Sequence, residues 1–475
     1  MIFGRETEKA VLDRLFLSKN AEFLAVYGRR RIGKTFLVAE FFKNKGVYFE
    51  VTGIKDASKK DQLKRFYKEF SSKFPKEALA APKDWSDAFD LMAAVAKNLD
   101  PQSKFILFLD ELPWLASAKS EFLPNLDYAW NHTLSRFPNI LLIVCGSAAA
   151  WILRKIIRNK GGLHGRLSAK IRLQPFTLSE TEHFLTGQGI QMTRKQLVEL
   201  YMAIGGVAKY IMNVTPGMSA TQIINELCFT PQGFLFSEFS ELYHSLFNEA
   251  NQHIAIVRAL AQKRKGITLG ELLSSAQIQQ GGRATEILEE LEESGFIARI
   301  PAFGKKLKEH KFRLIDEYTF FYLSWIEQAR ARILRNTTMS ENYWAKIHKT
   351  PAWYEWSGHA FETLCMKNIG KIKSALNIAG VMTEESHWQH AEAEIDLLID
   401  RADDCIHLCE IKFCNSEFVI DRAYAERLEK KRDVFQRITG TKKAIFITMF
   451  TPYGVLKNEN YLGLVDQQLT LDALF

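Results

Sequence analysis

The chain has 475 residues, of which 47% are hydrophobic and 25% are charged, and its formal net charge is +8. This length exceeds one compact core and indicates about three domains, while the ordinary composition excludes a disordered scaffold. The positive excess favours polyanionic partners only weakly, because it is spread over a large surface.

The most informative segment is 28–35, Gly-Arg-Arg-Arg-Ile-Gly-Lys-Thr, which fits the phosphate-binding pattern G-x-x-x-x-G-K-[ST]. The apolar run 23–27 before it predicts a buried parallel strand, and 35–42 predicts a helix. Lys34 would reach the β- and γ-phosphates of ATP, and Thr35 would hold Mg²⁺. The candidate nucleotide-binding residues here are Gly28, Arg29, Arg30, Arg31, Ile32, Gly33, Lys34, Thr35 and Phe36.

Two further strands would complete an ATP-hydrolysing site. The apolar run from Phe105 ends in Asp110-Glu111, where Asp110 would hold Mg²⁺ through water and Glu111 would act as the general base. The run 140–146 ends at Ser147, which would sit beside the γ-phosphate as a sensor; the alternative is an ordinary turn serine.

Several segments together resemble one known family. They are Phe3-Gly-Arg-Glu6, the loop 28–35, Leu109-Asp-Glu111, Cys145-Gly-Ser147 and Leu163-His-Gly-Arg166. Over roughly residues 1–245 the chain is similar to the archaeal-type ATPases, AAA+-like P-loop proteins of the STAND class. The resemblance implies that residues 3–6 lie near the adenine. It also implies that Arg166 approaches the γ-phosphate, from its own chain or from a neighbour in a homo-oligomer. The family often carries Gly-Gly-x-Pro in its helical lid, whereas this chain has Gly-Gly-Val-Ala at 205–208, without the proline.

The lid and connector are expected over 175–247, beginning with a helix capped by Ser179 with Glu180 in its first turn. Residues 250–315 then predict helices at 254–262, 269–275 and 283–293 and strands at 295–300 and 311–315, the order of a winged helix.

The sequence leaves two kinds of partner for this winged helix, a protein or DNA. Its expected recognition helix carries five glutamates, which would repel phosphates and favour a protein partner. The wing is basic and favours DNA contact, through Lys305, Lys306, Lys308, His310 and Lys311. An aromatic helix at 316–325 predicts core packing, and 328–349, with three arginines, predicts a linker.

The last part of the chain carries a second possible chemistry. Asp396 lies on one predicted strand, and Glu410 and Lys412 lie on the paired strand, where alternation puts them on one face. Two carboxylates that share Mg²⁺, with a lysine beside them to orient water, suit phosphodiester hydrolysis. The helix that follows is basic and could track a nucleic-acid backbone, through Arg422, Arg427, Lys430, Lys431 and Arg432.

This segment resembles the PD-(D/E)xK nuclease fold, in the version that follows archaeal-type ATPases. The resemblance assigns the D…E-x-K residues to Asp396, Glu410 and Lys412, and the acidic residue of the first helix to Glu362, at that helix's start. A loosely spaced D…E-x-K also arises by chance about once in a chain of this length, so the alternative is a domain that binds without cutting.

The fold class is therefore α/β. The expected parts are a P-loop ASCE ATPase core at 1–174, a helical lid and connector at 175–247, a winged-helix domain at 248–327, a linker at 328–349, and a PD-(D/E)xK nuclease-like domain at 350–475. The favoured function is an ATPase, with ATP and Mg²⁺ as cofactors, that gates the nuclease-like module on nucleic acid, DNA before RNA. The rival is a signalling switch whose C-terminal domain binds without cutting, and a third reading is a sequence-specific transcription regulator, weakened by the acidic helix.

A cytoplasmic protein that does not enter a membrane is expected. The first motif begins at Phe3, which leaves no room for a signal peptide, and the longest apolar stretch, 139–153, is too short to span a bilayer. The six cysteines show no secreted disulfide framework. Cys405, His407, Cys409 and Cys414 match no ordinary zinc spacing, and a strand would splay them over two faces, against a zinc site.

Overall fold

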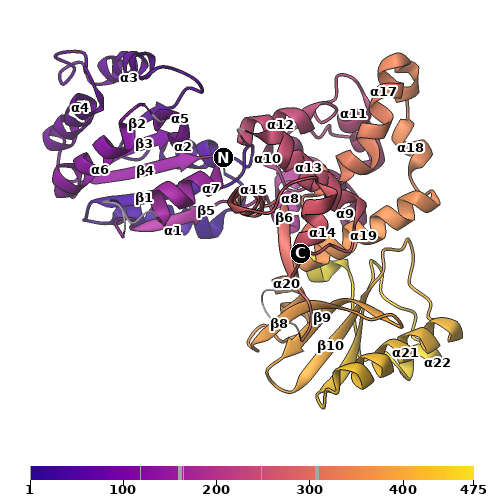
Figure 1. Cartoon of the computed structure of the whole chain (residues 1–475). Coiled ribbons are helices and arrows are strands. Elements are labelled where there is room, and N and C mark those ends of the chain that lie inside the picture. The colour runs from indigo at the N-terminus through magenta and orange to yellow at the C-terminus, as the bar shows by residue number, and fades with distance from the viewer. Residues whose placement is uncertain (1, 118, 159–162, 164, 248, 305–309) are drawn as a thin grey trace. The chain divides into compact units, whose positions relative to one another are not determined.

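The computed structural model describes residues 2–117, 119–158, 163, 165–247, 249–304 and 310–475. The chain forms two compact units, Met1–Pro175 and Phe176–Phe475 (Figure 1). No helix in these ranges is both long enough and apolar enough to cross a bilayer. All six cysteines are free thiols.

The first unit is built on a five-stranded parallel sheet in the order β2-β3-β4-β1-β5. Its strands are β1 Glu22–Tyr27, β2 Val47–Thr52, β3 Phe105–Asp110, β4 Ile140–Gly146 and β5 Ala169–Arg172. Its helices are α1 Glu6–Leu17, α2 Lys34–Phe42, α3 Lys59–Lys73, α4 Trp85–Asn98, α5 Leu112–Leu115, α6 Phe122–His132 and α7 Ala149–Ile152, followed by η2 Leu153–Ile157, with η1 Leu134–Arg136 before β4.

Helices cover both faces of this sheet (Figure 1), so β3 and β4 are buried along their whole length. One hydrophobic cluster packs α3, α4 and α6 on one face, and another packs α1 and α2 on the other. Strands buried on both faces read as continuous apolar runs, which is why the sequence predicts them well. In parallel strands the carboxyl ends meet at one edge, and β1, β3 and β4 all end there in motif residues.

The second unit begins with helices α8 Leu178–Gly187, α9 Arg194–Ile204, α10 Ala208–Ile211, α11 Ala220–Phe229 and α12 Glu238–Leu246. The predicted cap of the first helix, Ser179, is wrong, because Thr177 accepts from the Glu180 N–H and Glu180 accepts from the Thr177 N–H. This reciprocal capping box satisfies two free amides, so the helix starts two residues earlier. Gly206 lets the chain cross the Phe176 backbone, where a Cβ would lie 1.9 Å from the Phe176 carbonyl oxygen.

The next segment contains α13 Ala250–Gln262, α14 Leu269–Ser275, α15 Gly282–Glu293 and the antiparallel hairpin of β6 Ile297–Pro301 and β7 His310–Leu314. Lys305, Lys306 and Lys308 of the expected wing lie outside the described residues. The acidic α15 is partly neutralised locally, since Glu290 contacts His253, Glu292 contacts Arg299, and Glu286 contacts Arg283.

The predicted aromatic helix is confirmed as core, over α16 Glu317–Phe321 and η3 Tyr322–Ile326. The predicted linker at 328–349 is instead mostly helical, with α17 Glu327–Arg335, η4 Thr337–Ser340 and α18 Tyr343–Ile347. Ile333 is fully buried and Trp344 is 1% exposed, stacked on Phe229 of α11. These apolar side chains fix the segment against α11, so it is not a free tether.

The C-terminal part follows α19 Pro351–Lys367 and α20 Ile369–Ala375 with a mixed sheet in the order β12-β11-β10-β9-β8. The strands are β8 Thr383–Gln389, β9 Glu394–Arg401, β10 Cys405–Ile411, β11 Ala444–Phe450 and β12 Gln467–Leu469; α21 Arg422–Thr439, α22 Glu459–Leu462 and η5 Leu471–Leu474 complete it. β8, β9 and β10 pair antiparallel, whereas β11 pairs parallel to β10 after the α21 crossover.

One hydrophobic cluster runs through the second unit from Phe176 to Leu474. It contains side chains of α9 and α11, of the 250–315 segment, and of the C-terminal sheet. The parts expected as separate domains after residue 174 therefore share a core.

Candidate active sites

The glycine loop 28–33 is shaped by backbone positions that only glycine tolerates. Gly28 has a φ of 147° and Gly33 a φ of 93°, and a Cβ at Gly28 would lie 2.3 Å from the Leu173 carbonyl oxygen. Ile32, one of the candidate binding residues, is 1% exposed in the core, whereas Phe36 is 55% exposed. Ile32 thus holds the loop against the sheet.

Lys34 lies at the centre of this loop. Its ammonium donates to the carbonyl oxygens of Gly28 at 2.9 Å and Arg29 at 2.8 Å, and its side chain is buried. The three-donor ammonium is therefore fixed where the loop backbone curves around it.

Thr35, in the first turn of α2, contacts Asp110, the last residue of β3. The Thr35 hydroxyl donates to Asp110 Oδ2 at 2.7 Å, and the Glu111 N–H donates to Asp110 Oδ1 at 2.9 Å. Hydroxyl and carboxylate oxygens are the hard ligands that Mg²⁺ prefers, so this pair fits that ion.

Glu111 is held in an unusual backbone conformation, with a φ of 45°, at the start of α5. Its Oε2 accepts from the Ser147 hydroxyl at 3.0 Å and from the Ser147 N–H at 3.3 Å. Ser147 thus orients the Glu111 carboxylate, and its place beside the γ-phosphate stays a prediction. A non-glycine residue in this region costs about 1 kcal/mol or more, a strain typical of functional positions.

Gly53, which directly follows β2, was not identified from the sequence. Its N–H donates to the Asp110 carbonyl at 3.0 Å, and a Cβ there would lie 2.6 Å from the Glu111 carbonyl oxygen. The signal was present, since a glycine directly after an apolar strand marks close backbone approach.

Arg166 is exposed, and its backbone N–H donates to the Leu163 carbonyl at 3.2 Å. Residues 159–162 and 164 before it lie outside the described residues. The γ-phosphate role of Arg166 stays a prediction.

The second candidate site is centred on Glu410, at the end of β10. Lys412 lies 2.8 Å from Glu410 Oε1, Lys431 donates to Oε2 at 2.6 Å, and the Tyr424 hydroxyl donates to Oε1 at 2.8 Å. Burial opposes ionisation, but the two lysines outweigh it and hold the pKa of Glu410 at about 2.

Asp396, on the neighbouring strand, is left without such donors. Its Oδ2 is buried with no hydrogen-bond partner among the described residues, and the Lys412 ammonium is 3.9 Å away. Burial, and then the charges of Glu410 and Glu362, raise the pKa of Asp396 to about 7. An orphaned buried carboxylate oxygen beside a second carboxylate fits a divalent cation.

Glu362 lies late in α19, not at the helix start as expected, because Thr350 caps this helix and Pro351 opens it. Arg313 of β7 lies 3.3 Å from Glu362 Oε2, and His359 lies 3.5 Å away. The described residues contain no group of three or more His, Cys, Asp or Glu side chains that could hold a metal ion together. Asp396 and Glu410 are therefore the pair of described carboxylates that we consider as candidate cation ligands.

Lys431, predicted to track a nucleic-acid backbone, forms an ion pair with Glu410, and its contact with nucleic acid stays a prediction. Other basic residues of α21 do face outward: Arg422 is exposed beside Glu426, and Arg432 lies 3.7 Å from Asp433. Tyr424 was missed altogether, since fourteen residues and a loop separate it from Glu410.

A pH test follows from the Asp396 environment. The folded-state pKa of Asp396 is above the usual 3.8. The contribution of this carboxyl to folding stability is therefore fully present below pH 4 and is lost as pH rises through about 7. In EDTA, Asp396→Asn should therefore stabilise the protein at pH 8, by about 1–3 kcal/mol, and much less at pH 5. Thermal unfolding at both pH values measures this. Asp404→Asn, in the exposed β9–β10 turn, is the control, and an equal effect of both substitutions would contradict the assignment.

The glycine loop on a parallel sheet, with the Thr35–Asp110 pair at its edge, defines an ATPase-type P-loop domain. Residues 2–214 match the family described as an ATPase domain predominantly from Archaea. Residues 322–427 match a family of archaeal and bacterial proteins of unknown function. The chain is thus similar to the first family over its N-terminal part and to the second family over part of its C-terminal half.

Several archaeal proteins are similar to this chain over different lengths. An uncharacterised protein of Methanocaldococcus jannaschii is 25% identical over 407 residues, 84% of each chain. An uncharacterised ATP-binding protein of the same organism is 38% identical over 47 residues, 10% of this chain and 80% of that protein. A solved Walker-type ATPase of Pyrococcus abyssi has a TM-score of 0.50 and 18% identity, covering 68% of this chain and 96% of that one; this likeness concerns the fold alone.

Proposed function

We propose that the chain hydrolyses ATP with Mg²⁺ and thereby gates a C-terminal nuclease-like module that acts on nucleic acid, DNA before RNA. The observation that carries the ATPase half is the convergence of Thr35, Asp110 and Glu111 at one sheet edge, with hydrogen bonds fixing each side chain. Nucleotide binding alone would not require an oriented Glu111.

The roles follow from the geometry. Lys34 grips the terminal phosphates, and Thr35 and Asp110 hold Mg²⁺, which neutralises phosphate charge when bound. Glu111 takes the proton of the attacking water, and Ser147 keeps its carboxylate in one orientation.

The nuclease half is supported by the order of elements around Asp396. A helix, three antiparallel strands, a crossover helix and a parallel strand follow one another, as in the fold that the sequence resembles. Lys412 lies between the two carboxylates, where an ammonium can orient water or a phosphate oxygen.

Gating is supported by the shared core of the second unit. The helices that follow the ATPase core, from Phe176 onward, pack into the same cluster as the C-terminal sheet. Because close-packed interiors transmit displacement, movement of these first helices carries the nuclease-like part with it.

The rival function, a signalling switch with a non-cleaving C-terminal domain, is favoured by two observations. Glu410 already accepts from Lys412, Lys431 and Tyr424, so a cation must displace a donor to bind it. The acidic α15 also suits a protein partner better than DNA. Incubating the protein with plasmid, single-stranded DNA or RNA, with and without ATP, in Mg²⁺ or Mn²⁺, separates the two; absence of any cleavage selects the rival.

Arg166 provides a test of assembly. We expect Arg166→Ala to lower ATP turnover by about 100-fold or more with ATP affinity nearly unchanged, because such an arginine stabilises transition-state charge. Turnover per subunit that rises with protein concentration indicates action from a neighbouring copy. Arg136→Ala, at the end of η1, serves as the control, and an unchanged rate in the Arg166 variant removes this residue from the site.

A further inference from the structure

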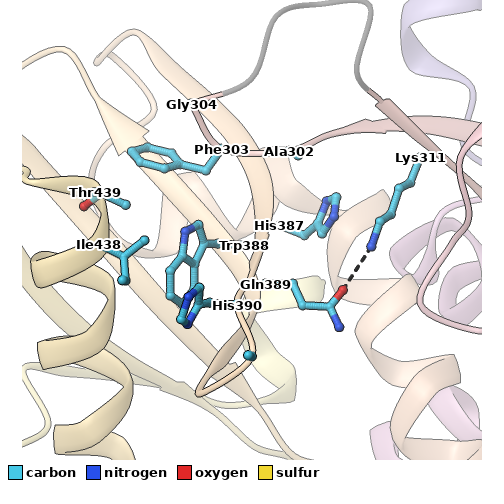
Figure 2. Close-up of a pocket in the computed structure, with 11 residues that line it drawn as sticks. Ala302, Phe303, Gly304, Lys311, His387, Trp388, Gln389, His390, Ile438 and Thr439 are labelled. Atoms are coloured by element: carbon cyan, nitrogen blue, oxygen red, sulfur yellow. Dashed lines mark hydrogen bonds between the residues drawn. The ribbon is translucent and has the colours of Figure 1, made fainter.

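A pocket of about 720 Å³ opens beside the edge strand of the C-terminal sheet (Figure 2). One wall is Ala302-Phe303-Gly304, the continuation of β6, and another is residues 387–391 of β8 and the turn after it. The Phe303 N–H donates to the His387 carbonyl at 3.1 Å, so both walls belong to one hydrogen-bonded structure. Ile438 and Thr439, at the end of α21, close the remaining side.

The apolar surface of the pocket is aromatic. The rings of Trp388 and His390 lie nearly parallel, at 20°, with centroids 6.1 Å apart. Trp388 also packs edge-on against Phe435, at 5.2 Å, and Phe303 contacts the same ring. Trp388 is 7% exposed, so its ring is held by the core and supports His390, whose partly exposed ring is the accessible flat face. Rigid aromatic faces bind flat rings with little loss of conformational freedom.

Polar groups line the opposite side, and Figure 2 shows the Lys311 ammonium donating to Gln389 Oε1, at 3.0 Å. His387 Nδ1 lies 3.1 Å from the Pro301 carbonyl, which can only accept, so Nδ1 carries a proton. Burial and the nearby Lys311 lower the pKa of His387, which leaves Nε2 a neutral acceptor. The pocket thus combines stacking surface, hydrogen-bonding groups and one cation.

The pocket lies on the same face of the sheet as the carboxylate site. Lys431, which binds Glu410, and Ile438, which lines the pocket, are both on α21, about 10 Å apart along the helix axis. In the β8–β9 pair, Trp388 is opposite Ile395, the residue before Asp396, so the two sites are close along the strands. Helix α21 borders both the pocket and the carboxylate site.

We propose that this pocket binds an unpaired base of single-stranded nucleic acid. A base has a flat π face that can stack against the His390 ring, which Trp388 supports from the core, and hydrogen-bonding edges that suit Gln389 and His387. Lys311 supplies charge for the backbone beside it. The inference rests on the proposed action on nucleic acid, but it does not require cleavage.

The test measures binding in EDTA, where no metal-dependent cleavage occurs. The probes are fluorescein-labelled single strands of about 20 nucleotides, as DNA and as RNA, a DNA strand of equal length with abasic sites throughout, and a duplex. We expect the full-length protein to bind the base-bearing single strands at least about tenfold more tightly than the abasic strand, and more tightly than the duplex.

Two variants locate that preference. His390→Ala removes a partly exposed ring, and Ile438→Glu places a negative charge at the pocket wall, where Ile438 is 45% exposed and not required by the core. Both should reduce the preference for base-bearing strands at least about fivefold. Leu462→Glu, the same change of charge at a side chain 72% exposed on α22, should leave it intact.

The outcomes are distinguishable. Binding of all strands with equal affinity, or an unchanged preference in both pocket variants, overturns the pocket assignment while nucleic-acid binding stands. A wild-type protein that binds no strand overturns the assignment together with the proposed function. Preference for RNA over DNA keeps the pocket and identifies the kind of strand.

Discussion

Replacing Glu111 with glutamine should stop ATP turnover while ATP still binds. The amide keeps the size of the side chain and can still accept from Ser147, but it cannot take a proton from water. We expect a loss of about 100-fold to 10,000-fold in the rate of hydrolysis, the usual contribution of a general base. Phosphate release and binding of labelled ATP, measured on the same preparation, separate the two effects.

Glu121→Gln is a matched control for this prediction. Like Glu111, Glu121 precedes a helix and has a backbone in the left-handed region, with a φ of 56°, but its exposed side chain forms an ion pair with Lys59. Lys34→Ala should abolish binding itself, since it removes the only ammonium bonded to the loop carbonyls of Gly28 and Arg29 in the described structure. Hydrolysis by Glu111→Gln at the wild-type rate would show that another group is the base.

Replacing Asp396 with alanine should abolish nucleic-acid cleavage and binding of Mn²⁺ at this site. The change removes the one buried carboxylate oxygen of this pair that lacks a donor, and leaves Glu410 with its lysines and Tyr424. Lys412→Ala should retain Mn²⁺ binding and slow cleavage by about tenfold or more, because only orientation is lost. Titration calorimetry with Mn²⁺ and a cleavage assay on single-stranded DNA measure the two quantities.

Lys431→Ala tests the same arrangement from the opposite side. It frees Glu410 Oε2, so we expect Mn²⁺ to bind more tightly than in the wild type. Asp433→Ala, at an exposed side chain of α21, should change neither Mn²⁺ binding nor the cleavage rate. Equal cleavage by wild type and Asp396→Ala would assign the activity to a contaminant.

The sequence predicts most of the ATPase site because its chemistry lies in continuous segments. β3 and β4 are apolar throughout and buried throughout, and Asp110, Glu111 and Ser147 stand directly at their ends. What the pattern does not reveal is that Ser147 binds Glu111. That contact depends on how two strand ends meet, which periodicity does not encode.

The second site was harder to predict from the sequence, because its contacts also join separate elements. Strand alternation places Glu410 and Lys412 together, but Lys431 and Tyr424 reach Glu410 from a helix whose rotation the sequence leaves open. The start of α19 was a missed signal, because Thr350-Pro351 is a cap followed by proline in the first turn. Residues 328–349 were predicted to be a linker because of their three arginines. The same segment carries Ile333, whose side chain is fully buried, and this apolar residue was given too little weight.

The central claim, that ATP gates cleavage, is tested most directly by the rate of single-strand cleavage in Mn²⁺ with and without ATP. We expect ATP to raise the wild-type rate at least about tenfold, a coupling of about 1.4 kcal/mol, and Lys34→Ala to cleave slowly under both conditions. A wild-type rate that is the same with and without ATP, and equal to that of Lys34→Ala, would contradict it.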